Sequence, residues 1–360
     1  MLLGKFRYRQ FLSNKAKRLN KRSLRFKEKH KLRLSLKYKG YVYINHPERA
    51  YKKCIRKQII ELTLPASFNI LINKQEVFGF VSSMLNMHAL RKVKQINLNL
   101  EEVLSIDFPA ICLLLSVVKE LSNNGIKVIG NYPQNEFCKK VFIESGFLKQ
   151  MIDDNGKPFE IETENFIVET GHNKTRNKDI ANAIMTTMES FEGYRRRFQP
   201  AYTIIMEICS NSVEHAYQNR PKHWRLGIYH EEDKISFTMT DTGVGILNTL
   251  HRKFWKLFKD KVTYQNEIDI LYKAFERKYG SSTTLVNRNK GLPCILDKLN
   301  RKYIKNLKVY TNNVCLDFTN KKDSILLEND FKGVLFYWEI DKECISNFDN
   351  DKLNNDNNKY

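Results

Sequence analysis

The 360-residue sequence has no hydrophobic run long enough to cross a membrane. Its longest apolar stretch, residues 108–118, is far shorter than the roughly 20 residues that a transmembrane helix requires. The N-terminus is basic from the start and lacks the apolar segment of a secretory signal. We therefore expect a cytoplasmic protein with no membrane span.

The sequence also lacks the cysteine patterns of metal sites and disulfide frameworks. Its seven cysteines are scattered, with no C-x-x-C pair and no close histidine partner, so we expect reduced and mostly buried thiols. A disordered chain is excluded by composition, because 42% of the residues are hydrophobic and 12% are aromatic. This length predicts two domains with an additional arm or tail.

Acidic residues are almost absent from the first 40 positions. Residues 1–40 hold 15 Lys and Arg against one acid, Glu28, whereas the whole chain carries a net charge of +21. Such a run binds nucleic acid through counterion release. It also fits a solubilising arm, an arm packed on an acidic face of its own protein, or contact with lipid or a partner protein. The sequence leaves these alternatives open.

From residue 57 onward, strand patterns alternate with helix patterns. Strands are predicted at residues 59–64, 96–100 and 126–130 from β-type apolar patterns and from a clear period of two at residues 96–100. Helices are predicted at residues 76–90, 108–121 and 136–144. This alternation favours a mixed or parallel sheet covered by helices.

Residues 57–150 resemble the STAS domain of anti-sigma-factor antagonists. The resemblance rests on Asn99-Leu100 at a strand end, Ser105-Ile106-Asp107 before a helix, and the segment at residues 144–148. In that family the turn reads Asp-Ser-x-Gly and its serine is phosphorylated. Here Phe108 occupies the serine position, and Ser116 lies too deep in an apolar helix to substitute. The resemblance therefore implies a scaffold that docks a protein partner, without a phosphorylation switch at this turn.

A second constellation lies on the helix predicted around residues 201–216. Glu207, Asn211 and His215 are four residues apart and share one helical face. An amide oxygen can ligate a hard cation and a carboxylate can orient a water molecule, so Glu207 and Asn211 can act on one small ligand. His215 is interpreted as structural.

Two glycine-containing segments follow in order. Asp241-Thr242-Gly243-Val244-Gly245 comes after a predicted strand, where Asp241 can accept a hydrogen bond from a ligand and the glycines permit close approach. Lys290-Gly291-Leu292 then opens a helix, and a helix N-terminus presents free amides and a favourable dipole to phosphate.

Together these segments resemble the asparagine box and the two glycine boxes of the GHKL ATPases, the Bergerat-fold family, across residues 175–341. The segment from Glu207 to Tyr217 is most similar to the bacterial anti-sigma-factor kinase branch. The resemblance implies an ATP and Mg²⁺ site in which Glu207 is the catalytic carboxylate, Asn211 the metal ligand and Asp241 the acceptor of the adenine amino group. The implied nucleotide-binding residues are Asn211, Asp241, Gly243, Gly245, Lys290, Gly291 and Leu292.

The chain departs from the GHKL pattern at several points. Pro293 replaces a glycine of the second glycine box, and Val334 replaces a frequent threonine after Gly333, which removes a hydroxyl near the base. The lid, residues 247–290, carries Trp255, Phe258, Leu271 and Phe275 at helical spacing, which predicts core packing. Its residues 281–284 could contact a phosphate or form a solvated loop. None of the eight histidines lies on a dimerising helical hairpin, so a histidine kinase is excluded.

The expected fold is α/β, an α+β sandwich in which a STAS-like mixed sheet precedes a Bergerat-fold ATPase domain. The expected domains are a basic flexible arm (1–40), a STAS-like domain (41–170), a GHKL ATPase domain (171–345) and a disordered Asn/Asp-rich tail (346–360). The expected function is a Mg²⁺-dependent ATP-binding regulatory protein, either an ATPase or a serine/threonine protein kinase-like switch. The alternatives are an ATP-gated nucleic-acid-associated protein and a non-catalytic ATP-binding scaffold. Monomer and homodimer both remain open.

Overall fold

The computed structural model describes residues 59–87, 93–151, 157, 159–160, 165–169, 177–215, 224–253, 267–276 and 291–357. The basic arm at residues 1–40 lies outside these residues, as does Lys290. The described residues form a mixed α/β structure with parallel and antiparallel sheets, in agreement with the expected α+β class.

The first half of the described chain alternates strands and helices. The elements are β1 (Ile59–Thr63), β2 (Ser67–Phe68), α3 (Ile70–Asn86), β3 (Gln95–Asn99), β4 (Ser105–Ile106), α4 (Phe108–Asn123), β5 (Lys127–Gly130), α5 (Glu136–Glu144) and η2 (Phe147–Gln150). Strands β1, β3 and β5 form a three-stranded sheet, and every described pair in it is parallel. Of the mixed or parallel sheet that the alternation favoured, these strands form the parallel one and not the mixed sheet expected for a STAS-like fold, because the helices between them return the chain in the same direction.

Polar side chains set the starts of the three α-helices in this half. Asn69, Asp107 and Asn135 cap α3, α4 and α5, each accepting a hydrogen bond from the backbone N–H three residues ahead. Asp107 also accepts from the N–H of Leu71, at 3.0 Å, and so joins the N-termini of α3 and α4. Burial raises the pKa of Asp107 to about 6, against the opposing effect of these backbone donors.

The second half contains a five-stranded sheet in the order β6-β7-β8-β10-β9, with antiparallel pairing throughout. Its elements are β6 (Phe166–Glu169), α6 (Asn177–Glu192), α7 (Gln199–His215), β7 (Trp224–His230), β8 (Lys234–Asp241), α8 (Ile246–Lys253), α10 (Glu267–Phe275), α11 (Gly291–Asn300), β9 (Lys305–Asp317), η3 (Lys321–Asp323), β10 (Ile325–Asp341) and α12 (Lys342–Asn357). Strand β6 pairs with β7, so residues 166–169, which the sequence assigned to the first domain, belong to the five-stranded sheet.

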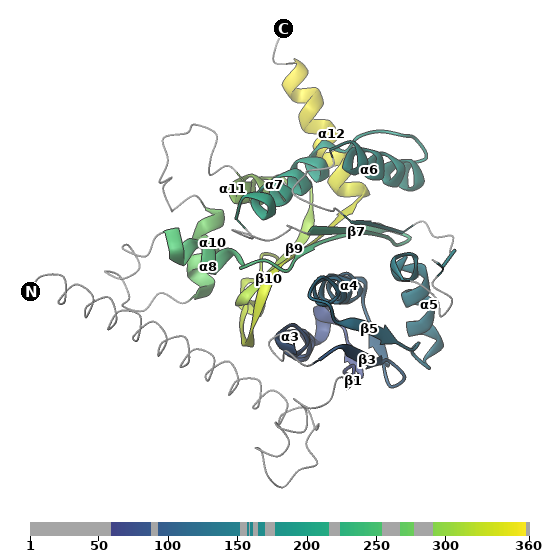
Figure 1. Cartoon of the computed structure of the whole chain (residues 1–360). Coiled ribbons are helices and arrows are strands. Elements are labelled where there is room, and N and C mark those ends of the chain that lie inside the picture. Colours follow the sequence, from purple (N-terminus) through teal and green to yellow (C-terminus); the bar gives the residue numbers. More distant parts are fainter. Residues whose placement is uncertain are drawn as a thin grey trace, which may run out of the picture.

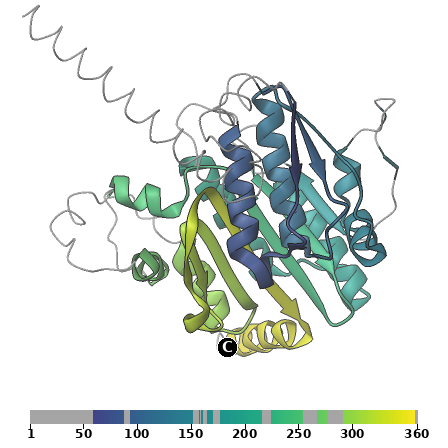
Figure 2. The same ribbon diagram turned by 90° about the horizontal axis from the view of Figure 1, so that it is seen from below.

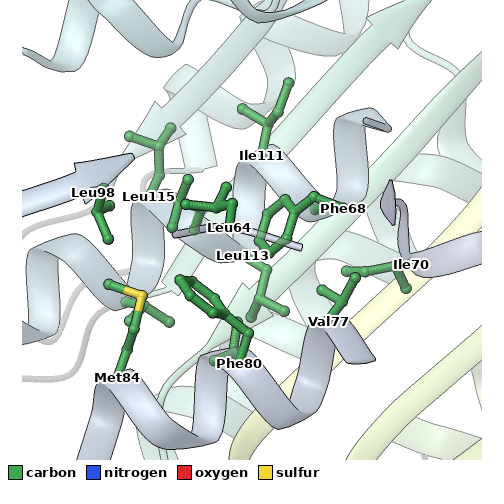
Figure 3. Close-up of a cluster of buried hydrophobic side chains, with 14 of the residues drawn as sticks. Leu64, Phe68, Ile70, Val77, Phe80, Met84, Leu98, Ile111, Leu113 and Leu115 are labelled. Carbon is green, nitrogen blue, oxygen red and sulfur yellow. The ribbon is translucent and has the colours of Figure 1, made fainter. Parts of the chain in front are cut away.

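The two halves share a hydrophobic core. Figure 1 shows α3 and α4 between the two sheets, with α7 and α11 on the far face of the five-stranded sheet. Figure 2 shows α3 alongside β10, which it contacts. The core of the first half, drawn in Figure 3, continues into the second sheet through Tyr310, Phe331, Leu335 and Tyr337. Alternate residues of β10 therefore face the α3 side and the α7 side.

The C-terminal segment is a docked helix. In α12, the ring of Phe348 lies 5.4 Å from that of Phe198 and 5.2 Å from that of Tyr303, and Asp349 pairs with Arg196 at 2.8 Å. The prediction of a disordered tail is wrong for residues 346–357, because a few apolar and charged contacts anchor an otherwise polar helix. Residues 358–360 lie outside the described part of the chain.

Candidate functional site

Helix α7 and the start of α11 bring three of the predicted residues together. Glu207 and Asn211 lie one turn apart on α7, both partly exposed, and Gly291 is the first residue of α11. A Cβ atom at residue 291 would lie 3.0 Å from Asn211 Nδ2 and 3.1 Å from Glu207 Oε2. The N-terminus of α11 therefore faces the carboxylate and the amide directly, and glycine makes this close approach possible.

Asp241, at the end of β8, contacts the same helix α7 through Ser212. Its carboxylate is 5% exposed and accepts hydrogen bonds from the Ser212 hydroxyl at 2.7 Å and from the N–H of Gly243 at 2.8 Å. Burial raises the pKa of Asp241, and the hydrogen bonds from Ser212 and from the backbone oppose this shift. Because Ser212 follows Asn211 on α7, the hydroxyl links the predicted metal ligand to the predicted adenine acceptor.

The loop after Asp241 is held by β9. Gly245 has φ +85°, and a side chain there would overlap that of Asn312, which is 3% exposed. Asn312 donates from Nδ2 to the carbonyl of Val244 at 3.1 Å, and the Thr311 hydroxyl accepts from the N–H of Ile246 at 2.9 Å. Gly245 is therefore required by both its conformation and its packing.

Gly333 allows β10 to approach the end of β8. It has φ +152°, and a Cβ atom there would overlap the carbonyl oxygen of Asp241. A hydroxyl does lie beside Asp241, that of Ser212 on α7. The sequence analysis missed Ser212, although it is adjacent to Asn211. It also missed Thr311 and Asn312, because nothing local to β9 indicates a contact with the glycine loop.

The start of α11 tolerates the departure at Pro293. This residue is third in the helix, where the N–H has no intrahelical partner, so proline removes no backbone hydrogen bond of the helix. Leu292 is partly buried against the core on the α7 side, which indicates a packing role. Lys290, Trp255, Phe258 and the residues 281–284 lie outside the described residues.

Two further expectations concern packing. Leu271 and Phe275 of α10 are 0% and 1% exposed and belong to the core on the α7 side, which confirms the predicted packing role of these two lid residues. Phe108 is 4% exposed, and its ring lies 4.9 Å from that of Tyr229 in β7. The turn that carries a serine in STAS domains is therefore buried against the face of the sheet opposite α7.

The geometry combines a carboxylate, an amide oxygen, a helix N-terminus and a buried carboxylate acceptor. Within the described residues, no cluster of three or more His, Cys, Asp or Glu side chains is placed to enclose a metal ion. A cation here would therefore need an external anion and water to complete its shell around Asn211. Such a site suits an anionic ligand that brings its own oxygen ligands.

In comparisons with known proteins, no family model and no curated protein matches this chain. In the described residues, no helix combines the length and the apolar composition that a membrane span requires.

Proposed function

We propose that the chain is a Mg²⁺-dependent, ATP-binding regulatory protein of the GHKL type that acts in the cytoplasm. The observation that carries the proposal is the close approach of Gly291 to Glu207 and Asn211. These residues come from separate helices, and the resemblance to GHKL proteins requires that they meet. The hydrogen bond from Ser212 connects Asp241, the proposed adenine acceptor, to helix α7, which also carries Glu207 and Asn211.

The proposed roles follow from the chemistry of each group. Asn211 would hold Mg²⁺ through its amide oxygen, and the cation would neutralise phosphate charge there. The N-terminus of α11 at Gly291 binds phosphate through its free amides. Asp241 accepts the adenine amino group, and Glu207 orients the attacking water or protein hydroxyl.

Calorimetry of the full chain with ATP and ADP tests the site. We expect ATP and ADP to bind well only when Mg²⁺ is present. Equal affinity for these nucleotides in excess chelator would contradict the role of Asn211. Asp241→Asn should weaken adenine nucleotides by about 1–3 kcal/mol, because it replaces a charged acceptor of a buried amino group. The control Asp233→Asn changes an exposed residue of the hairpin between β7 and β8 and should bind normally. Unchanged discrimination between ATP and GTP in Asp241→Asn would remove this residue from the site.

Glu207→Ala separates catalysis from binding. If the protein turns ATP over, the variant should retain nucleotide binding and lose turnover by about 10²- to 10⁴-fold, the range for a positioned general base. If it transfers phosphate to a protein hydroxyl, the loss should occur only with the protein partner present. The control Glu232→Ala alters an exposed carboxylate and should leave turnover unchanged. If neither the wild-type protein nor Glu207→Ala turns ATP over, the result would favour a non-catalytic ATP-binding scaffold or switch.

A second candidate function is an ATP-gated nucleic-acid-associated protein. It is favoured by the composition of residues 1–40, which hold 15 basic residues and one acidic residue. A salt-dependent gel shift with DNA or RNA that disappears on deletion of residues 1–40 would support it. A shift that persists without this arm would argue against the arm as the binding element.

A further inference from the structure

Consecutive residues at the end of β8 face opposite layers of the protein. Asp241 contacts Ser212 of α7, whereas Thr242 lies on the α4 side, with its Oγ1 3.5 Å from Oε2 of Glu120. The alternation of side chains along an extended strand accounts for this arrangement. The backbone at residues 241–242 therefore connects a contact with α7 to a contact with α4.

One stripe of α4 faces the five-stranded sheet and becomes more polar toward this strand end. Phe108, Cys112, Ser116 and Glu120 follow one another at intervals of four residues, which places them on one helical face. At the apolar end, a Cβ atom on Gly227 of β7 would lie 2.7 Å from the Phe108 ring, so the helix and the strand are in tight contact. At the polar end a small pocket lies between α4 and the strands, and its lining includes Ser116, Glu120, Thr242 and the buried Arg225.

The sheet surface beneath α4 is also polar. Thr238 and Thr240 of β8 are 0% and 2% exposed on the side that α4 covers, and among the described residues their hydroxyls have no hydrogen-bond partner. By contrast, α3 meets β9 and β10 through aromatic rings, with Phe78 at 5.1 Å from both Tyr310 and Phe331. The α3 contact is apolar, whereas the α4 contact has an apolar end and a polar end.

We propose that the C-terminal end of α4 is a sensor of the nucleotide site, so that the STAS-like half is the resident partner that responds to ligand binding at Asp241. This inference rests on the proposed nucleotide site. When a ligand donates to the Asp241 carboxylate, the hydrogen bonds from Ser212 and Gly243 readjust and Thr242 moves relative to Glu120. The apolar contact at Phe108 and the α3 contacts remain fixed, and the movement is confined to residues 116–123 of α4. A ligand produces this shift only if it binds the two arrangements with different affinity.

Hydrogen–deuterium exchange of the full chain, with and without Mg²⁺-ATP, tests the proposal alongside calorimetry. We expect saturating nucleotide to change exchange in residues 116–123 by about threefold or more, while the start of α4 and all of α5 stay unchanged. Glu120→Gln keeps the helix and the size of the side chain, so it should bind nucleotide normally and lose most of the response in α4. The control Glu136→Gln, at an exposed position in the first turn of α5, should respond like the wild type.

The outcomes separate this inference from the proposed function. Nucleotide binding by calorimetry without any change in α4 overturns the inference and leaves the proposed function standing. A full response in Glu120→Gln also overturns it, because the movement would then not depend on the Thr242–Glu120 contact. Absence of nucleotide binding in the wild type overturns both.

Discussion

At the scale of single residues, Asp107 connects two helices that are distant in sequence. It accepts from Ala110 N at 2.9 Å in α4 and from Leu71 N at 3.0 Å in α3. Asp107→Ala should lower the free energy of unfolding by about 1–3 kcal/mol, because it removes the cap of α4 and also the acceptor of the Leu71 N–H at the start of α3, whose own cap Asn69 remains. Urea denaturation measures this loss. Asn135→Ala removes the cap of α5 alone and should cost less, so an equal or larger loss there would contradict the double role of Asp107.

Two buried threonines of the five-stranded sheet should respond to valine in opposite ways. Within the described residues the Thr238 hydroxyl has no partner, so Thr238→Val should raise the free energy of unfolding by about 1–2 kcal/mol by removing an unsatisfied buried group. The Thr311 hydroxyl donates to the carbonyl of Gly333 and accepts from Ile246. Thr311→Val should therefore destabilise the protein. Thermal or urea unfolding distinguishes the two, and destabilisation by Thr238→Val would reveal a hydrogen bond at that hydroxyl.

At the scale of elements, α12 shows how a polar segment acquires structure. Phe348→Ala should lower the free energy of unfolding by about 1–3 kcal/mol, because this ring packs on Phe198 and Tyr303. Leu353→Ala is the matched control on the same helix, since Leu353 is 63% exposed, and its effect should stay within about 0.5 kcal/mol. Equal effects of the two variants in urea denaturation would show that α12 does not depend on its docked face.

Elements with a strong local pattern were predictable. The helix at residues 136–144 and the helix beginning at residue 108 match α5 and α4, because an N-cap and an apolar period both lie within a few residues. Helix α3 begins at Ile70, ahead of the predicted residue 76, since Asn69 supplies a cap that the apolar pattern does not reveal. Strand β10 extends over 17 residues because it pairs with both β8 and β9, a length that no local pattern indicates.

At the scale of the whole molecule, the two halves depend on each other. Tyr310, Phe331 and Leu335 of the second half complete the core around α3 and α4. A fragment of residues 59–151 should therefore expose this apolar surface, bind a hydrophobic dye and unfold at lower denaturant than the full chain. Addition of a fragment of residues 160–360 should suppress dye binding by covering α3 and α4. A fragment that is as stable alone as in the full chain would contradict this dependence.

The sequence alone determined what depends on short separations along the chain. The spacing of Glu207 and Asn211 places them on one face of α7, and the glycines after Asp241 indicate a tight turn, because helical period and backbone freedom are local properties. The absence of a hydroxyl at Phe108 is likewise a matter of residue identity. None of these inferences required knowledge of what lies beside the segment.

Only the tertiary structure decided which segments meet. The approach of Gly291 to Asn211, the Ser212–Asp241 hydrogen bond and the support of Gly245 by Asn312 each join separate elements. The same holds for the burial of α4 against β7 and β8. The polar residues on this face of β8 would by themselves predict exposure to solvent, yet they are buried. The physical reason is that a sheet face is covered when several distant elements together remove enough apolar area from water. No single segment determines that total area.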